Sequence, residues 1–430
     1  MLFRLPKLPD LGRDVHLLNA VLGMFAVSFF GIQMLIKVLY ILRLGYGLEF
    51  VGLFSSISAF SYMAMSVPSG LMGGRFGPRK TMISGGALTV VGMAMLPLTE
   101  FVSPAMRDGW AIVSQFVGTG GWAFFSVNIV PTLMASSTPQ SRSRTFAWNS
   151  LFRGLGGFVG TLVGGLLPGL FAGLLDQSLD GPVPYRYALW VGVALGTLSM
   201  IPLSQIRPVQ RLQAAEAEAD QGGFPFLPVA WVVVFVLFSH GGRATCQAFC
   251  NPFMDTDLHL SPASIGFITG LGQFVAVLVP LLSPGLVERF SNGRILLLAN
   301  LGAAISLIPL VLLPHWITVA LGRLGILALS ALWLPVLQVF QMELVGSRWR
   351  SLAYSIVSMA MALSFGSISL AGGYIAATWG YQRLFLLGAG LYLLGAMLMW
   401  GLLKLPFMRP ATPPADGQPA VAGGRSSVER

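Results

Sequence analysis

The stretch VGLFSSISAFSYMAMSVPSGLMGGRFGPRK, residues 51–80, returns 214 positions later as IGFITGLGQFVAVLVPLLSPGLVERFSNGR, residues 265–294. The constant offset aligns Gly52 with Gly266, a phenylalanine with a phenylalanine, and the closing Arg-Phe pair with itself. A shorter match joins SRSRTFAW, which begins at Ser141, to SRWRSLAY at an offset of 206. Two matches at nearly the same offset predict that the chain consists of two halves built as parallel repeats.

Composition places these repeats in a membrane. The 430 residues are 55% hydrophobic and only 10% charged, with a mean hydropathy of +0.75, whereas soluble domains carry roughly 25% charged residues. Apolar runs of about 20 residues can cross a hydrocarbon core of roughly 30 Å as helices, and lipid excludes other open structures. Twelve such spans are expected at residues 17–41, 48–72, 80–99, 110–134, 146–171, 186–204, 227–250, 263–286, 294–313, 315–341, 351–377 and 383–404.

The expected fold is therefore an all-α membrane protein with twelve transmembrane helices in two pseudo-symmetric six-helix halves. The longest polar interruption lies between spans six and seven. It divides the chain into an N-terminal half at 1–204, a central loop at 205–226 and a C-terminal half at 227–405. The tail at 406–430 is rich in Pro, Gly and Ala, and is expected to be disordered. The first run is interpreted as a retained helix, because no small-residue cleavage site follows it.

Basic residues are distributed unevenly between the two ends of the spans. The formal net charge is +10, and 18 of the 26 Lys and Arg residues fall in the N-terminus, the even-numbered loops or the tail. The odd-numbered loops hold four. By the positive-inside rule both termini are expected in the cytoplasm, in a multi-pass protein of a bacterial inner membrane. The basicity is thus explained by topology, and nucleic acid is excluded as a partner.

The loop between spans two and three reads GLMGGRFGPRK. With the twelve spans, the central polar loop and the half repeats, it resembles the major facilitator superfamily over nearly the whole chain. Gly74 stands where the family usually has aspartate, which weakens the expected charge relay of the inward gate, whereas the second copy keeps Glu288 before Arg289. The resemblance implies a gating set made of Gly70, Gly74, Arg75, Gly77, Arg79, Lys80, Arg142, Glu288, Arg289 and Arg348.

Two further motifs resemble family patterns with departures. GTLVGG at 160–165 is similar to the antiporter motif of span five, but Thr161 replaces its proline, so membership of the drug-proton antiporter branch is not implied. In span ten, LGRLGILALSALW, which contains Arg323, resembles an arginine motif that the family usually carries in span four. The corresponding part of span four holds Gln115.

Four basic residues fall inside spans: Lys37, Arg153, Arg243 and Arg323. No acidic residue is expected in the middle of any span. Ionisable groups in the bilayer core cost at least about 2.5 to 3.5 kcal/mol, so they usually face a water-filled cavity or a partner. Snorkelling toward the membrane surface explains Lys37 and Arg153 equally well.

One face of span seven is polar. At 100° per residue, His240, Arg243, Gln247 and Asn251 fall within about an 80° arc. The repeat offset of 214 carries the last two onto Gln33 and Lys37 of span one. The resemblance implies that spans one and seven line a central cavity, where the two polar stripes would face each other. The alternative is that these side chains bond neighbouring helices, and for His240 a packed core histidine is an equal alternative.

The expected solute-binding set combines these stripes with other polar and aromatic positions in the spans. Its members are Gln33, Lys37, Trp122, Asn128, His240, Arg243, Gln247, Asn251 and Arg323. His240 is the intramembrane group expected to titrate near neutral pH, and is the candidate for proton coupling. Uniport, anion exchange and proton coupling stay open.

Cations without a fixed carboxylate favour an anionic or zwitterionic solute. The leading interpretation is a secondary active or facilitative transporter that works as a monomer by alternating access of the two halves, with the lipid bilayer, a solute and a coupling proton or counter-anion as partners. Alternatives are a multidrug or amphiphile exporter and a transport-inactive receptor or scaffold. An enzyme is not expected, since the chain has no HExxH and no P-loop pattern. Cys246 and Cys250 are interpreted as packing residues, and neither a metal nor a cofactor is expected.

Overall fold

The computed structural model describes residues 12–138, 141–207, 224–279, 286, 289–312, 315–345 and 349–404. These ranges are helical with short connections and contain no strand. Eleven of the described helices are long and apolar enough to cross a membrane, and Pro262–Leu278 is a shorter apolar helix. The predicted all-α membrane fold is confirmed, although the end of the eighth predicted span, 263–286, lies mostly outside the described residues.

The N-terminal half begins with one continuous span made of three segments: α1 (Arg13–Phe25), η1 (Ala26–Gln33), which is a π-helix, and α2 (Met34–Arg43). The other elements of this half are α3 (Leu48–Phe76), α4 (Pro78–Met95), the 3₁₀ turns η2 (Leu96–Phe101) and η3 (Pro104–Met106), α5 (Arg107–Ala135), α6 (Arg142–Leu175) and α7 (Val183–Ser204). The C-terminal half contains α8 (Phe226–Thr256), α9 (Pro262–Leu278), α11 (Asn292–Leu312), α12 (Trp316–Glu343), α13 (Arg350–Trp379) and α14 (Tyr381–Lys404).

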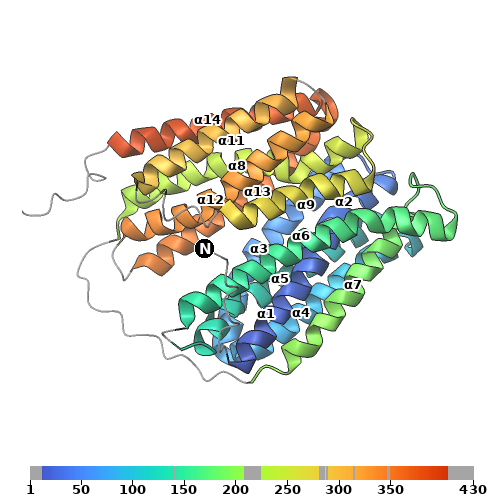
Figure 1. Cartoon of the computed structure of the whole chain (residues 1–430), viewed down its shortest axis with the longest axis horizontal. Coiled ribbons are helices and arrows are strands. Elements are labelled where there is room, and N and C mark those ends of the chain that lie inside the picture. The colour runs from blue at the N-terminus through green and yellow to red at the C-terminus, as the bar shows by residue number, and fades with distance from the viewer. Residues whose placement is uncertain are drawn as a thin grey trace, which may run out of the picture.

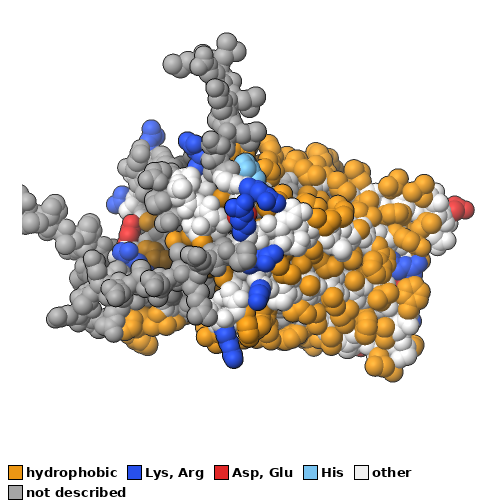
Figure 2. Space-filling model, turned by 90° about the horizontal axis from the view of Figure 1, so that it is seen from below, with side chains coloured by type: hydrophobic (Ala, Val, Ile, Leu, Met, Phe, Trp, Pro, Cys, Tyr) orange, Lys and Arg blue, Asp and Glu red, His pale blue; other side chains and the backbone are white. Residues whose placement is uncertain are grey.

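The two halves lie against each other, with α1 to α7 below and α8 to α14 above in Figure 1. We call the end that holds Arg43, Leu175, Thr256 and Trp379 the odd-loop end, and the opposite end, which holds Phe76 and Lys404, the even-loop end. Figure 2 shows most of the Lys and Arg side chains of one face gathered toward one end, while hydrophobic side chains cover most of the rest. This distribution is typical of a protein whose middle lies in lipid.

Close glycine contacts join the halves at two places. A Cβ on Gly52 of α3 would lie 2.8 Å from the Gly373 Cα of α13, and a Cβ on Gly165 of α6 would lie 2.8 Å from the Gly266 Cα of α9. Both contacts involve a glycine of the repeated stretch, Gly52 in the first copy and Gly266 in the second. The repeat therefore has a structural meaning, because its paired glycines occupy equivalent positions where one half packs on the other.

The gating loop, by contrast, is not packed against the other half. A Cβ on Gly70 or Gly74, near the even-loop end of α3, would meet nothing within 4 Å. Gly77 has a φ of +91° and makes the turn into α4, a conformation that favours glycine. The described contacts between the halves thus run from the odd-loop end to about the middle of α6 and α13, where Phe158 meets Phe274 and Gly366 meets Phe60.

Candidate functional site

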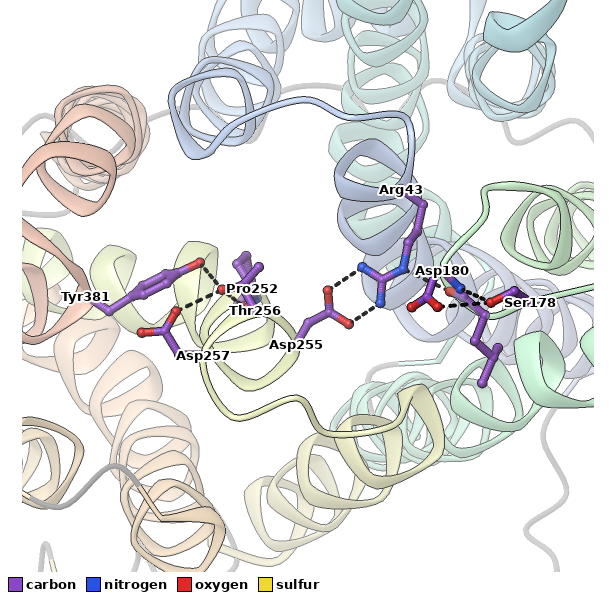
Figure 3. A network of polar contacts seen from close by, with 9 residues as sticks. Arg43, Ser178, Asp180, Pro252, Asp255, Thr256, Asp257 and Tyr381 are labelled. Carbon is purple, nitrogen blue, oxygen red and sulfur yellow. Dashed lines mark hydrogen bonds and ion pairs between the residues drawn. The ribbon is translucent and has the colours of Figure 1, made fainter.

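An ion pair ties the two halves at the odd-loop end (Figure 3). Arg43, the last residue of α2, binds Asp255 in the last turn of α8 through two parallel contacts of 2.7 Å, Nη1 to Oδ2 and Nη2 to Oδ1. The Arg43 Nε also donates to the Leu179 carbonyl at 2.9 Å, and the guanidinium lies 5.3 Å from the centre of the Tyr185 ring. Only 2% of the Asp255 side chain is exposed. Two-point geometry of this kind is specific to an arginine and a carboxylate.

The sequence did not single out this pair. Span seven was predicted to end at 250, but α8 runs through Pro252 to Thr256 and places Asp255 inside a membrane-length helix. Arg43 was counted as a loop residue. The available signal was modest: a basic residue in a loop otherwise poor in positive charge, and a carboxylate directly after a predicted span.

A second ion pair lies within the N-terminal half. Arg186 Nη1 of α7 binds Glu100 Oε2 of η2 at 2.8 Å, and the Tyr40 hydroxyl donates to the other Glu100 oxygen at 3.0 Å. This pair is also near the odd-loop end but does not bridge the halves. The two ion pairs thus differ in what they join, although their chemistry is the same.

The predicted stripe of span one is bonded inside the N-terminal half. The Gln33 amide donates to the Leu189 carbonyl of α7 at 3.2 Å, while Lys37 Nζ donates to Gln115 Oε1 of α5 at 3.4 Å and lies 5.7 Å from the centre of the Phe54 ring. Both side chains line a cavity of about 20 Å³ between η1, α2, α4 and α5. The Lys37–Gln115 contact joins the span-one cation to the span-four glutamine that the motif comparison had singled out.

The predicted stripe of span seven is divided. His240 and Arg243 line a second small cavity, of about 10 Å³, between α8, α11, α12 and α14. Asn251 accepts a hydrogen bond of 3.2 Å from Thr269 of α9, and Gln247 is half-buried. The two stripes therefore contribute to separate cavities, one in each half, in this arrangement of the helices.

Arg323 of α12 is almost fully buried against α8. Its Nη1 donates to the Cys246 carbonyl at 2.8 Å and lies 3.4 Å from the Cys246 sulfur, which is 3.2 Å from the Cys250 sulfur. The spacing of four residues had suggested packing, and both cysteines are buried. They also contact a buried cation, Arg323, which the spacing of the two cysteines does not predict.

Two other predicted residues lie in helix contacts of the N-terminal half. Asn128 of α5 donates to the Ser69 carbonyl and hydroxyl of α3 at 3.3 and 3.0 Å. Trp122 stacks on Phe29, with ring centres 5.3 Å apart, inside an aromatic cluster. Both side chains connect helices in this arrangement.

The residues predicted to form the gate lie at the even-loop end, and the structure describes part of this set. Arg79 donates to the Ser204 carbonyl at the end of α7 at 2.5 Å, and the Arg75 guanidinium lies 5.4 Å from the centre of the Phe76 ring. Lys80 and Arg289 are exposed. Glu288, Arg348 and the side chain of Arg142 lie outside the described residues.

Positive charge dominates the middle of the described helices. Lys37, Arg153, Arg243 and Arg323 form no ion pair with any carboxylate of the described chain, where the ion pairs are those of Arg43 and Arg186. Within the same ranges no group of three or more His, Cys, Asp or Glu residues could hold a metal ion. The described interior therefore offers cations and hydrogen-bond donors to a ligand.

Known proteins share this architecture. A nucleoside transporter, NupG, superposes with a TM-score of 0.72 at 13% identity, covering 91% of this chain and 100% of that chain. A D-xylose-proton symporter gives 0.72 at 16% identity, covering 92% and 98%. The human organic anion transporter MFSD10 gives 0.62 at 13% identity, covering 91% and 100%. At such identities the likeness establishes the fold.

The sequence itself carries the family assignment. No curated protein matches it. The model of the Major Facilitator Superfamily, however, matches residues 19–249 and 233–428, which together are nearly the whole chain. The family and the similar structures are solute transporters rather than enzymes. The chain therefore belongs to the Major Facilitator Superfamily and is an integral multi-pass membrane protein.

Proposed function

We propose that the protein moves a small anionic or zwitterionic solute across the membrane by alternating access of its two halves. One observation carries the charge preference: the four cations inside the spans have no carboxylate partner among the described residues. An uncompensated cation in a medium of low dielectric is stabilised by an anionic ligand, through charge-assisted hydrogen bonds. The positive electrostatic potential of these four residues disfavours an organic cation.

The solute contacts that we propose are those side chains of the predicted set that keep free hydrogen-bonding capacity. Gln247 is half-buried, and Arg243 forms no hydrogen bond within the described chain. Lys37 has one hydrogen bond within the described residues, to Gln115 at 3.4 Å. Gln33, Asn128 and Asn251 have helix partners in this state, so their contact with solute requires the helices to rearrange. An anionic solute also agrees with the similar fold of the organic anion transporter MFSD10. At 13% identity that likeness concerns the fold alone, so the proposal rests on the side chains named above.

We infer the orientation from charge. The even-loop end carries most of the basic residues and faces the cytoplasm by the positive-inside rule, with both termini on that side of a bacterial inner membrane. The halves are assigned as 1–204 and 227–405, joined by the loop at 205–226. With the halves joined at the odd-loop end, the described arrangement corresponds to a monomeric carrier closed toward the outside.

Uptake into proteoliposomes tests the proposal. The panel contains labelled monocarboxylates, sugar phosphates, amino acids, neutral sugars and organic cations, and we expect transport of an acidic or zwitterionic member. Arg243→Ala and, separately, Lys37→Gln should each lower that uptake about 10- to 100-fold, since a charged hydrogen bond contributes about 1.5 to 3 kcal/mol.

Arg144→Ala is the matched control, because Arg144 is an exposed arginine near the start of α6 and should leave uptake unchanged. Arg243→Lys should restore part of the uptake. Selective transport of an organic cation, or intact uptake in both the Arg243 and the Lys37 variants, would refute the proposed charge preference.

A further inference from the structure

A small cavity inside the C-terminal half is lined by buried polar atoms that have no hydrogen-bond partner within the described residues. It lies between α8, α11, α12 and α14 and measures about 10 Å³, the room of about one water-sized body. Its lining includes Arg243 and Trp333 together with Ser239, His240 and Asn300. No Asp or Glu is among the described residues that line it.

Two of the lining side chains can only donate hydrogen bonds. Trp333 is 5% exposed, and its buried Nε1–H has no partner. Arg243 forms no hydrogen bond or ion pair within the described parts of the chain. Neither a guanidinium nor an indole can accept a hydrogen bond, so the group that satisfies both must be an acceptor.

Asn300 and His240 can also donate hydrogen bonds to an acceptor in the cavity. Asn300 Nδ2 donates to Ser239 Oγ at 2.9 Å and leaves Oδ1 without a partner. If the amide is reversed, Oδ1 accepts from the Ser239 hydroxyl and the NH₂ group points to the cavity. His240 Nδ1 is buried without a partner and carries the proton in one of the two tautomers of the ring. Arg243, Trp333, His240 and Asn300 can thus present N–H groups to the cavity, and the hydroxyls of Ser239, Ser330 and Tyr392 complete its polar lining.

Charge then distinguishes an anion from water. A water molecule could satisfy the hydrogen bonds of the cavity, but it would leave the Arg243 charge uncompensated inside the membrane, close to a second cation, Arg323. We propose that the cavity binds one halide-sized inorganic anion, held by Arg243 and Trp333. In this state the cavity has room for about one water-sized body, less than a carboxylate or a phosphate group needs, so the halide is the counter-ion of Arg243 until the helices rearrange for solute. This site lies inside one half of the protein, and goes beyond the proposed solute path by adding a counter-ion for the transporter's own arginine.

Thermal unfolding of the purified full-length protein in neutral detergent tests this assignment. Sodium bromide or chloride is titrated against sodium gluconate at constant ionic strength. We expect a saturable, halide-specific rise in Tm for the wild type, no such rise for Arg243→Gln, and about tenfold weaker halide affinity for Trp333→Phe, which removes one N–H donor. Arg153→Gln, which also removes a cation from a span but lies outside this cavity, should respond as the wild type does.

Equal halide responses in the wild type and in Arg243→Gln would overturn the site and leave water as its occupant. An acetate titration that matches bromide would overturn the size argument and point to the acid group of a solute. Because binding is measured without transport, failure of this site leaves the proposed function untouched. Failure of the transport panel would likewise leave the halide site standing.

Discussion

At the residue scale, His240 stays the predicted group for coupling protons to transport. Its ring centre lies 6.3 Å from those of Trp333 and Phe365, and its Nδ1 has no partner. We expect His240→Gln to flatten the dependence of uptake on pH, because the imidazole can take up and release a proton and the amide cannot. Accumulation driven by a pH gradient should then be lost, which for one proton per solute is about tenfold per pH unit.

The measurement is uptake into proteoliposomes at a series of internal and external pH values. His16→Gln is the matched control, because His16 is an exposed histidine in the first turn of α1. Solute exchange in the absence of a gradient should survive in His240→Gln. A pH profile that matches the wild type would assign His240 to packing between the two rings and leave uniport or anion exchange.

At the element scale, the contact of α6 with α9 controls how closely the halves approach. A Cβ on Gly165 would lie 2.7 Å from the Pro262 carbonyl oxygen and 2.8 Å from the Gly266 Cα, so Gly165→Val forces the helices apart. We expect it to destabilise the state closed at the odd-loop end by about 1 to 3 kcal/mol, the usual range for overpacking. Distances between spin labels placed at the odd-loop ends of α6 and α9 should shift toward longer values.

Gly169→Val gives the comparison, because Gly169 lies one turn further along the same helix and a Cβ there would meet nothing within 4 Å. It should leave both the label distances and the Tm unchanged. Equal effects of the two substitutions would mean that valine acts through the helix itself and not through the contact with α9.

Some features of the helices could be predicted from the sequence and others could not. Length, apolar runs and the repeat predicted the helices and the two halves, because these depend on local composition and on a constant offset. The offset also placed Gln33 and Lys37 on one stripe of span one, and both line the same cavity. Their partners could not be predicted in this way, since Gln33 contacts α7 while Lys37 contacts α5. The π-helix at residues 26–33, with i to i+5 hydrogen bonds, was not predicted either, because periodicity assumes 100° per residue.

Contacts between distant residues escaped prediction for a different reason. Arg43 and Asp255 are 212 positions apart, close to the repeat offset of 214, but that offset aligns Arg43 with Asp257 and Asp255 with Ile41, so it does not mark the two as partners. Periodicity reports which face of a helix is polar, and carries no information about which partner that face meets. The two small cavities are likewise products of the packing of four helices each, which no single span encodes.

At the scale of the whole molecule, the Arg43–Asp255 pair favours one state of the carrier over the other, because it joins the halves only where the odd-loop end is closed. Asp255→Asn should raise the population that is open at this end, since it leaves the Arg43 guanidinium without its carboxylate. A partner lost from a fully buried pair costs about 3 to 5 kcal/mol. The Arg43 side chain is 20% exposed, so we expect a smaller shift, of about 1 to 2 kcal/mol.

Spin-label distances between the odd-loop ends of α2 and α8 measure that population, and the exchanged pair Arg43→Asp with Asp255→Arg should restore part of the closed state. Glu100→Gln is the matched control, because it breaks the ion pair with Arg186 inside the N-terminal half. It should lower the Tm without lengthening the distance between the halves. If Glu100→Gln opens this end as much as Asp255→Asn does, the effect arises from loss of charge at the odd-loop end in general and not from a bond between the two halves.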